Sequence, residues 1–187
     1  MNFKPLTKEA WPDLETLFGS KGACGGCWCM YWRLTHREYE DNKGSKNREK
    51  LHTLVKKERP LGVLAFDRDI PVGWCSISPR KSLVRLQNSR LFKKIDEKSV
   101  WSISCLFIKK EYRREGLSAK LIHAAVNYAF EEGATIIEAY PIIPKEKTMP
   151  DSFSWVGFVK PFRKAGFKEV SRPSETRVFM RLEKQIL

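Results

Sequence analysis

Residues 100–133, VWSISCLFIKKEYRREGLSAKLIHAAVNYAFEEG, decide the fold of this chain. The segment Val100–Ile108 is β-branched, aromatic and nearly continuous in apolar character, which is typical of a buried central strand. The segment Leu117–Glu132 predicts an amphipathic helix, because apolar side chains recur four positions apart and Gly133 follows as a C-cap. A strand therefore runs through a short glycine-containing turn into a long helix.

The turn between this strand and this helix reads Arg113-Arg114-Glu115-Gly116-Leu117-Ser118. The first N–H groups of a helix have no intrahelical partner, and the macrodipole adds about half a positive charge at that end. Gly116 lets a phosphate approach the backbone without a Cβ in the way, and the small Ser118 serves the same purpose. The two arginines can neutralise phosphate charge from the rim. This turn therefore predicts a site for a phosphate-bearing ligand.

Shorter elements surround this core. Strands are expected at Leu61–Phe66, Pro71–Ser78, Thr135–Tyr140, Phe167–Ser171 and Arg177–Leu182. Helices are expected at Lys8–Phe18, Lys46–Glu58 and Trp155–Lys164, with a charged, partly helical insertion at Arg80–Lys98. This order predicts one α/β domain, of the α+β mixed-sheet kind, built around a single sheet.

Composition narrows the function classes. The net charge of +13 suits nucleic acid, a membrane surface or an anionic small molecule. Acidic residues are mixed into every basic run, so nucleic acid is the less expected partner. The chain has no run of eighteen apolar residues, so the sequence predicts no membrane-spanning helix. Because no signal-peptide pattern is present and the cysteines number five, we expect free thiols and a cytoplasmic protein.

The cluster Cys24-Gly25-Gly26-Cys27-Trp28-Cys29, with His36 downstream, raises the alternative of a zinc site. Structural zinc sites usually pair one C-x-x-C with a second C-x-x-C or with two histidines. Only one such pair is present here. We therefore expect no metal.

The segment 100–133 resembles the acyl-CoA-binding core of the GNAT acetyltransferase superfamily, whose hallmark is [RQ]-x-x-G-x-[GA] between the fourth strand and the following helix. The resemblance continues through TIIEAYP at 135–141 and KPFRKAGF at 160–167, and spans roughly Leu61 to Leu182. It implies a central mixed sheet that splays between the fourth and fifth strands. It also implies one domain over residues 1–187, with a helical acceptor-side region at 1–60 and the acyl-CoA-binding core at 61–182.

The resemblance implies an N-acetyltransferase, in which an amine of a small molecule or protein directly attacks acetyl-CoA, without a metal. Amides from Arg114 to Ser118 would hold the pyrophosphate, with Arg113 at the rim. The pantetheine arm would pair with the backbone of Cys105, Leu106, Phe107 and Ile108. The segment after the first helix lines the acceptor pocket in this family, so we expect an apolar or cationic acceptor to meet an aromatic wall of Trp28, Tyr31 and Trp32. A homodimer is compatible with the resemblance.

Three positions depart from the family pattern. Ser118 replaces Gly or Ala, Phe162 stands where the family often has a proton-donating Tyr, and Ser102 stands where some members carry a glutamate base. The proton path must then come from elsewhere. Glu138 and Tyr140 share one face of the fifth strand, so we expect Glu138 to accept the amine proton and Tyr140 to donate to the thiolate.

Other functions remain open at this stage. Loss of the usual Tyr favours a non-catalytic acyl-CoA sensor as the main alternative, and the basic charge leaves a nucleic-acid-binding module. Acylation of a hydroxyl or a thiol in place of an amine is a further alternative.

Overall fold

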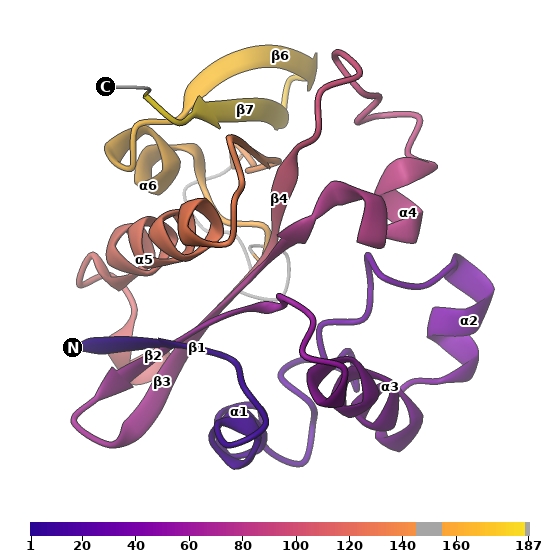
Figure 1. The fold of residues 1–187 in the computed structure, drawn as a ribbon, viewed down its shortest axis with the longest axis vertical. Coiled ribbons are helices and arrows are strands. Elements are labelled where there is room, and N and C mark those ends of the chain that lie inside the picture. The colour runs from indigo at the N-terminus through magenta and orange to yellow at the C-terminus, as the bar shows by residue number, and fades with distance from the viewer. Residues whose placement is uncertain (145–154, 186–187) are drawn as a thin grey trace.

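Figure 1 shows the computed structural model, which describes residues 1–144 and 155–185. Within these ranges one seven-stranded sheet runs in the order β1-β2-β3-β4-β5-β7-β6. Its strands are β1 (Asn2–Pro5), β2 (Gly62–Asp67), β3 (Ile70–Pro79), β4 (Trp101–Ile108), β5 (Ile136–Ala139), β6 (Lys168–Ser174) and β7 (Arg177–Glu183). The pair β4–β5 is parallel and the other pairs are antiparallel, which confirms the predicted mixed α/β architecture.

Helices cover both faces of the sheet (Figure 1). They are α1 (Trp11–Phe18), α2 (His36–Asp41), α3 (Ser45–Lys56), α4 (Val84–Gln87), α5 (Leu117–Glu131) and α6 (Val159–Lys164), with 3₁₀ turns at Arg80–Ser82 and Lys110–Tyr112. Alternation along β2 separates two cores: Val63 and Ala65 pack towards α5, whereas Leu64 and Phe66 pack towards α1 and α3. Each face of the central strands is therefore buried, as the apolar run in β4 predicts.

No helix in the described ranges has the length and apolar character that a membrane span requires.

The sheet opens between β4 and β5. The two strands pair from Trp101 with Ile137 to Ile103 with Ala139, and β4 then continues to Ile108 paired with β3 but not with β5. At the same point the β3–β4 register shifts, which leaves Ser104 as an extra residue in β4. Such a bulge bends a strand and strengthens its twist. The expected splay between the fourth and fifth strands is therefore present, and it begins at Ser104.

Two elements were not expected from the sequence, and one begins later than expected. The strand β1 pairs along the edge of β2, so residues 1–60 begin with a strand and are not entirely helical. The helix α2 was also missed. Helix α6 begins at Val159, because Trp155–Gly157 is a turn in which Gly157 has a φ of 78°.

Candidate active site

The turn from β4 into α5 has the geometry of an anion site. Gly116 is the N-cap of α5 with a φ of 80°, and a Cβ built there would meet no atom within 4 Å. Leu117 and Leu121 are buried in the core, which fixes the end of α5 against the sheet. The N-cap of this 15-residue helix therefore lies beside open space, as a phosphate site at the helix N-terminus requires.

The arginines and Glu115 at this turn differ in their roles. Arg113 donates from Nε to the carbonyl oxygen of Ile108 over 2.8 Å, so its side chain ties the turn to the end of β4. Arg114 and Glu115 are exposed, and Arg114 has a left-handed φ of 68°. Ser118 is half-buried in the first turn of α5. Of the predicted residues 113–118, Arg114, Glu115 and Gly116 are exposed at the helix end, whereas Leu117 anchors it in the core.

A cavity of about 330 Å³ lies beside the free part of β4. Aromatic rings, thiols and small apolar groups line it: Phe18, Ala23, Cys24, Cys27, Cys29, Tyr31, Trp32, Tyr39, Cys105, Leu106, Phe107 and Trp155. Tyr31 and Trp32 are edge-to-face at 5.1 Å between ring centroids, and the Trp155 ring lies 5.0 Å from Tyr31. Among the described lining residues none carries a carboxylate or a basic group, so this cavity suits an apolar ligand or the apolar part of one.

The three residues predicted to bind the acceptor do not all lie in the same place. Tyr31 and Trp32 line the cavity, whereas Trp28 is buried between Trp11 and Phe18 of α1. Arg85 stacks on the Tyr31 ring at 4.0 Å and so occupies the cation position over that ring. The Nε1 of Trp32 is buried and has no hydrogen-bond partner within the described part of the chain.

Sequence reasoning missed the part of Trp155 in this site. The N–H of Leu106 donates to the carbonyl oxygen of Trp155 over 2.6 Å. A Cβ on Gly157 would come within 2.8 Å of Leu106, so the segment passes very close to β4. The sequence signal was Gly157, which permits that close approach. The carbonyl of Trp155 therefore accepts a hydrogen bond from a β4 N–H group that was expected to bind the pantetheine arm.

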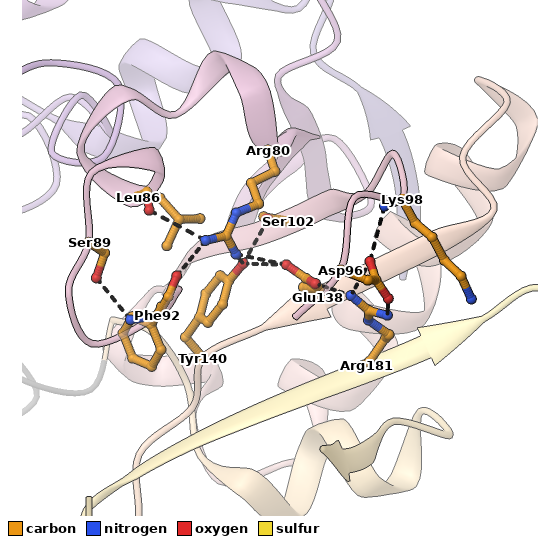
Figure 2. A network of polar contacts seen from close by, with 10 residues as sticks. All are labelled: Arg80, Leu86, Ser89, Phe92, Asp96, Lys98, Ser102, Glu138, Tyr140 and Arg181. Atoms are coloured by element: carbon orange, nitrogen blue, oxygen red, sulfur yellow. Dashed lines mark hydrogen bonds and ion pairs between the residues drawn. The ribbon is translucent and has the colours of Figure 1, made fainter. Parts of the chain in front are cut away.

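Glu138 and Tyr140 belong to a buried polar network. Figure 2 shows the guanidinium groups of Arg80 and Arg181 on either side of the Glu138 carboxylate. Arg80 donates to Oε2 over 2.8 Å and Arg181 donates to Oε1 over 2.7 Å. Tyr140 lies 3.0 Å from the Ser102 hydroxyl, and Arg181 also binds Asp96 over 2.6 Å. The structure thus brings the two predicted residues together, but neither lines the cavity.

Burial decides the proton state of the tyrosine in this network. Glu138 is 1% exposed and Tyr140 is 2% exposed. Burial, followed by the charge of Glu138, raises the pKa of Tyr140 well above its usual range. The phenol therefore stays protonated across the whole physiological range.

A family model described as the acetyltransferase (GNAT) family matches residues 28–147, more than half of the chain. The chain belongs to the GNAT acetyltransferase family.

Solved structures of other GNAT proteins share the fold at low sequence identity. A ribosomal-protein-alanine N-acetyltransferase from Brucella melitensis is 14% identical with a TM-score of 0.55, covering 98% of this chain and 100% of that one. The PaiA N-acetyltransferase from Thermoplasma acidophilum, in complex with coenzyme A, is 17% identical with a TM-score of 0.51, covering 98% of each chain. The NatC complex bound to Gag peptide and coenzyme A is 14% identical with a TM-score of 0.53, also covering 98% of each chain. No curated protein matches the sequence.

In this GNAT acetyltransferase the other charged members of the network around Glu138 were not foreseen. Arg80, Asp96 and Arg181 come from the 3₁₀ turn after β3, the loop before β4 and strand β7. These three residues lie far apart in the sequence, so no periodic pattern along the chain indicates that they meet. The register of β5 against β7, which pairs Glu138 with Arg181, is the only local signal, and it depends on the folded sheet.

The zinc alternative has no geometric counterpart in the described residues. Over 1–144 and 155–185 no group of three or more His, Cys, Asp or Glu side chains is arranged to hold a metal ion. His36 lies at the start of α2 with its side chain 80% exposed, beside Arg85. The thiols of Cys24, Cys27 and Cys29 instead line the cavity.

Proposed function

We propose that this GNAT protein binds acetyl-CoA and transfers its acetyl group to an amine. One observation carries the proposal: a bulged strand, β4, parts from β5 at Ser104 and leads directly into a helix whose N-cap, Gly116, lies beside open space. The edge of β4 that β5 leaves unpaired and the first amides of α5 then follow one another along the chain. The amides suit a diphosphate, and the strand edge suits the rest of the cofactor. The similar structures of the Thermoplasma acidophilum protein and of the NatC complex, both with coenzyme A, support the same co-substrate.

The cofactor would be bound mainly by backbone groups. Amides at 114–118 would hold the pyrophosphate, and the charged rim of Arg113 and Arg114 would offset its negative charge. The pantetheine arm would lie along Cys105–Ile108 as an added strand edge. To release the N–H of Leu106, the carbonyl of Trp155 must shift, so binding is coupled to movement of that segment.

The chemistry follows from direct attack. The amine nitrogen forms a bond to the thioester carbonyl carbon, the carbon–sulfur bond breaks, and the departing thiolate must gain a proton. Tyr140 is proposed as the donor, because its hydroxyl carries a proton at neutral pH; since burial also raises its pKa, the transfer requires the phenol to leave its buried network first. Glu138 is proposed to receive the amine proton. Both of its oxygens already accept hydrogen bonds from Arg80, Arg181 or Tyr140, so this transfer requires rearrangement of the network.

The acceptor is proposed to carry an apolar or aromatic body next to its amine. Tyr31, Trp32 and Trp155 supply ring faces, and the unpartnered Nε1 of Trp32 can hold one oxygen of the acceptor. The amine is proposed to belong to a small molecule or to a protein. One similar structure is a ribosomal-protein-alanine N-acetyltransferase and another is the NatC complex bound to Gag peptide, which favours testing peptide amines too.

The direct test combines binding and turnover. Acetyl-CoA affinity is measured by calorimetry, and thiol release is followed over a panel of aromatic amines, polyamines and peptides with free N-termini. We expect micromolar-range binding and amine-dependent thiol release, strongest with aromatic or apolar amines. Binding with no turnover on any amine would favour a sensor, and no binding at all would contradict the proposal.

A further inference from the structure

Cys29 lies at the end of a glycine-rich segment, in a backbone conformation that bulky residues avoid. Both Trp28 and Cys29 have left-handed φ values, 44° and 52°. Hydrogen bonds from Trp28 N–H to Gly22 and from Met30 N–H to Cys27 hold the segment in this shape. Left-handed backbone at non-glycine residues is costly and persists where the surrounding structure enforces it, often at functional sites. The side chain of Cys29 is nearly buried yet lines the cavity.

The sheet places a hydrogen-bond donor at the sulfur of Cys29. The indole Nε1 of Trp74 donates to Sγ over 3.3 Å, and hydrogen bonding with Cys105 and Ser76 also acts to lower the pKa of Cys29. Ser76 Oγ itself accepts from Ser104 over 3.0 Å, so its own hydrogen is free to point to Cys29. A neutral thiol is a weak acceptor, whereas a thiolate suits several donors. The arrangement is that of an anion pocket.

A buried cation completes this pocket. Arg33 is 7% exposed, and among the described residues its guanidinium has only neutral acceptors, the Leu61 carbonyl and the Ser76 hydroxyl. Its Nε has no partner among the described residues. A buried charge without an opposite charge is costly, and a thiolate at Cys29 supplies one.

The pKa values agree with the geometry. The Cys105 hydrogen bond, then the Trp74 bond and the charge of Arg33, lower the pKa of Cys29 to about 7 against the opposing effect of burial. The thiols around it differ: hydrogen bonding to Cys29 and burial raise the pKa of Cys105, and burial raises the pKa of Cys27 and of Cys75. Among these four thiols, Cys29 is therefore the one whose thiolate form is favoured.

This sulfur lies next to the strand proposed to carry the acyl thioester. Cys105, which donates to Cys29, directly precedes Leu106 in β4, and all three side chains line the same cavity. We propose that Cys29 is a covalent acyl-acceptor site. Its thiolate attacks the carbonyl carbon of acyl-CoA, a new carbon–sulfur bond forms, the original one breaks, and coenzyme A leaves as a thiolate that takes a proton from solvent. The exchange replaces one thioester by another and needs no oxidant. It rests on the proposed function, because the acyl group comes from acyl-CoA.

The test measures acetylation of Cys29 from two donors. Reduced protein is incubated with acetyl-CoA or with S-acetyl-N-acetylcysteamine, a small acetyl thioester that lacks the nucleotide, then quenched in acid and analysed by peptide mass spectrometry. We expect one acetyl group on the Cys29 peptide with either donor, removable by neutral hydroxylamine as a thioester is. The label should vanish in Cys29→Ser and persist in Cys24→Ser, since Cys24 is an exposed thiol of the same segment.

The outcomes separate this inference from the proposed function. Labelling by the small thioester alone supports Cys29 and counts against acyl-CoA binding. If acetyl-CoA binds and amines are acetylated while neither donor labels Cys29, the inference is overturned and the proposed function stands. Absence of label from both donors overturns the inference whatever acetyl-CoA does.

A second variant tests the anion pocket without removing the thiol. Trp74→Phe deletes the N–H donor and keeps an aromatic ring. The rate of alkylation of Cys29 by iodoacetamide is measured against pH, with Cys24→Ser as the background. In the parent protein the midpoint should lie near pH 7, and in Trp74→Phe it should move upward, with a several-fold slower rate at neutral pH. An ordinary thiol midpoint in the parent protein would overturn the inference.

Discussion

The hydroxyl of Tyr140 donates to the carboxylate of Glu138 across 2.9 Å, between side chains two positions apart on one face of the fifth strand. Alternation along the strand predicts that these two side chains lie on the same face, and the structure joins them by a hydrogen bond. Arg80 bridges the pair, since its Nη1 donates both to Glu138 over 2.8 Å and to Tyr140 over 2.6 Å. The contact lies in a buried cluster, so its hydrogen bonds are shielded from water and each loss should be measurable.

Replacement of Tyr140 by Phe should lower kcat far more than it weakens acetyl-CoA binding. The ring stays packed on Phe92 and Phe179, whose centroids lie 4.7 and 5.0 Å away, while the only proton donor proposed for the thiolate is lost. General acid catalysis contributes roughly 10²–10⁴-fold, so we expect a fall of about 10² in kcat. Steady-state kinetics and calorimetry measure the two quantities. Tyr128→Phe, on α5, is the matched control, and unchanged turnover in Tyr140→Phe would remove Tyr140 from the mechanism.

Glu138→Gln should strongly destabilise the fold. It removes the one carboxylate that Arg80 and Arg181 share at a site that is 1% exposed, and it leaves the Arg80 guanidinium without an acidic partner among the described residues. Breaking a buried ion pair costs about 3–5 kcal/mol. Denaturant unfolding measures the free energy. The control Glu183→Gln removes an exposed carboxylate 3.8 Å from Lys98 and should change stability by less than about 1 kcal/mol.

Acid should weaken the protein partly through Asp96. The hydrogen bond from Arg181 lowers the pKa of this carboxyl from 3.8. A carboxyl whose folded pKa lies below its unfolded pKa contributes stability above the unfolded value and loses it as the pH falls through the folded value. We expect the free energy of unfolding to drop below about pH 3.8, and to drop less steeply in Asp96→Asn. Equal slopes for the two proteins would show that the contact with Arg181 is not made in solution.

Acetyl-CoA should change the fluorescence of Trp155. Its carbonyl holds the N–H of Leu106, which the pantetheine arm is proposed to take, so binding should move the indole away from Tyr31 and Trp32. Titration of the parent protein should give a saturable change in emission that is largely lost in Trp155→Phe. A change of the same size in that variant would assign it to another tryptophan and contradict the proposed movement.

Strand β4 and helix α5 could be predicted from the sequence because their apolar patterns are long and unbroken. Strand β4 begins one residue later than expected, and α5 ends one residue earlier. Helix α2 was missed although Thr35 and Glu38 form a capping box, a signal that was present in the sequence. Strand β1 could not be foreseen, because its four residues are mostly exposed and gain their strand form only by pairing with β2.

The candidate site divides in the same way. The glycine turn at residue 116 depends on local backbone and could be placed from the sequence. Trp28 was expected on the cavity wall but packs on α1, since its left-handed backbone turns the indole away. The contacts of Arg80 with Glu138 and of Cys29 with Trp74 join residues far apart in the chain, so only the folded sheet could reveal them.

The central claim is that backbone amides at the start of α5 hold the diphosphate of acetyl-CoA. Calorimetry on two variants of the same helix tests it most directly. Gly116 and Gly133 lie at opposite ends of α5, both have a positive φ, and a Cβ at either would meet no atom within 4 Å. A charge-assisted hydrogen bond contributes about 1.5–3 kcal/mol, so Gly116→Asp should weaken acetyl-CoA binding at least about tenfold, while Gly133→Asp leaves it unchanged. Equal affinity in the two folded variants would contradict the account.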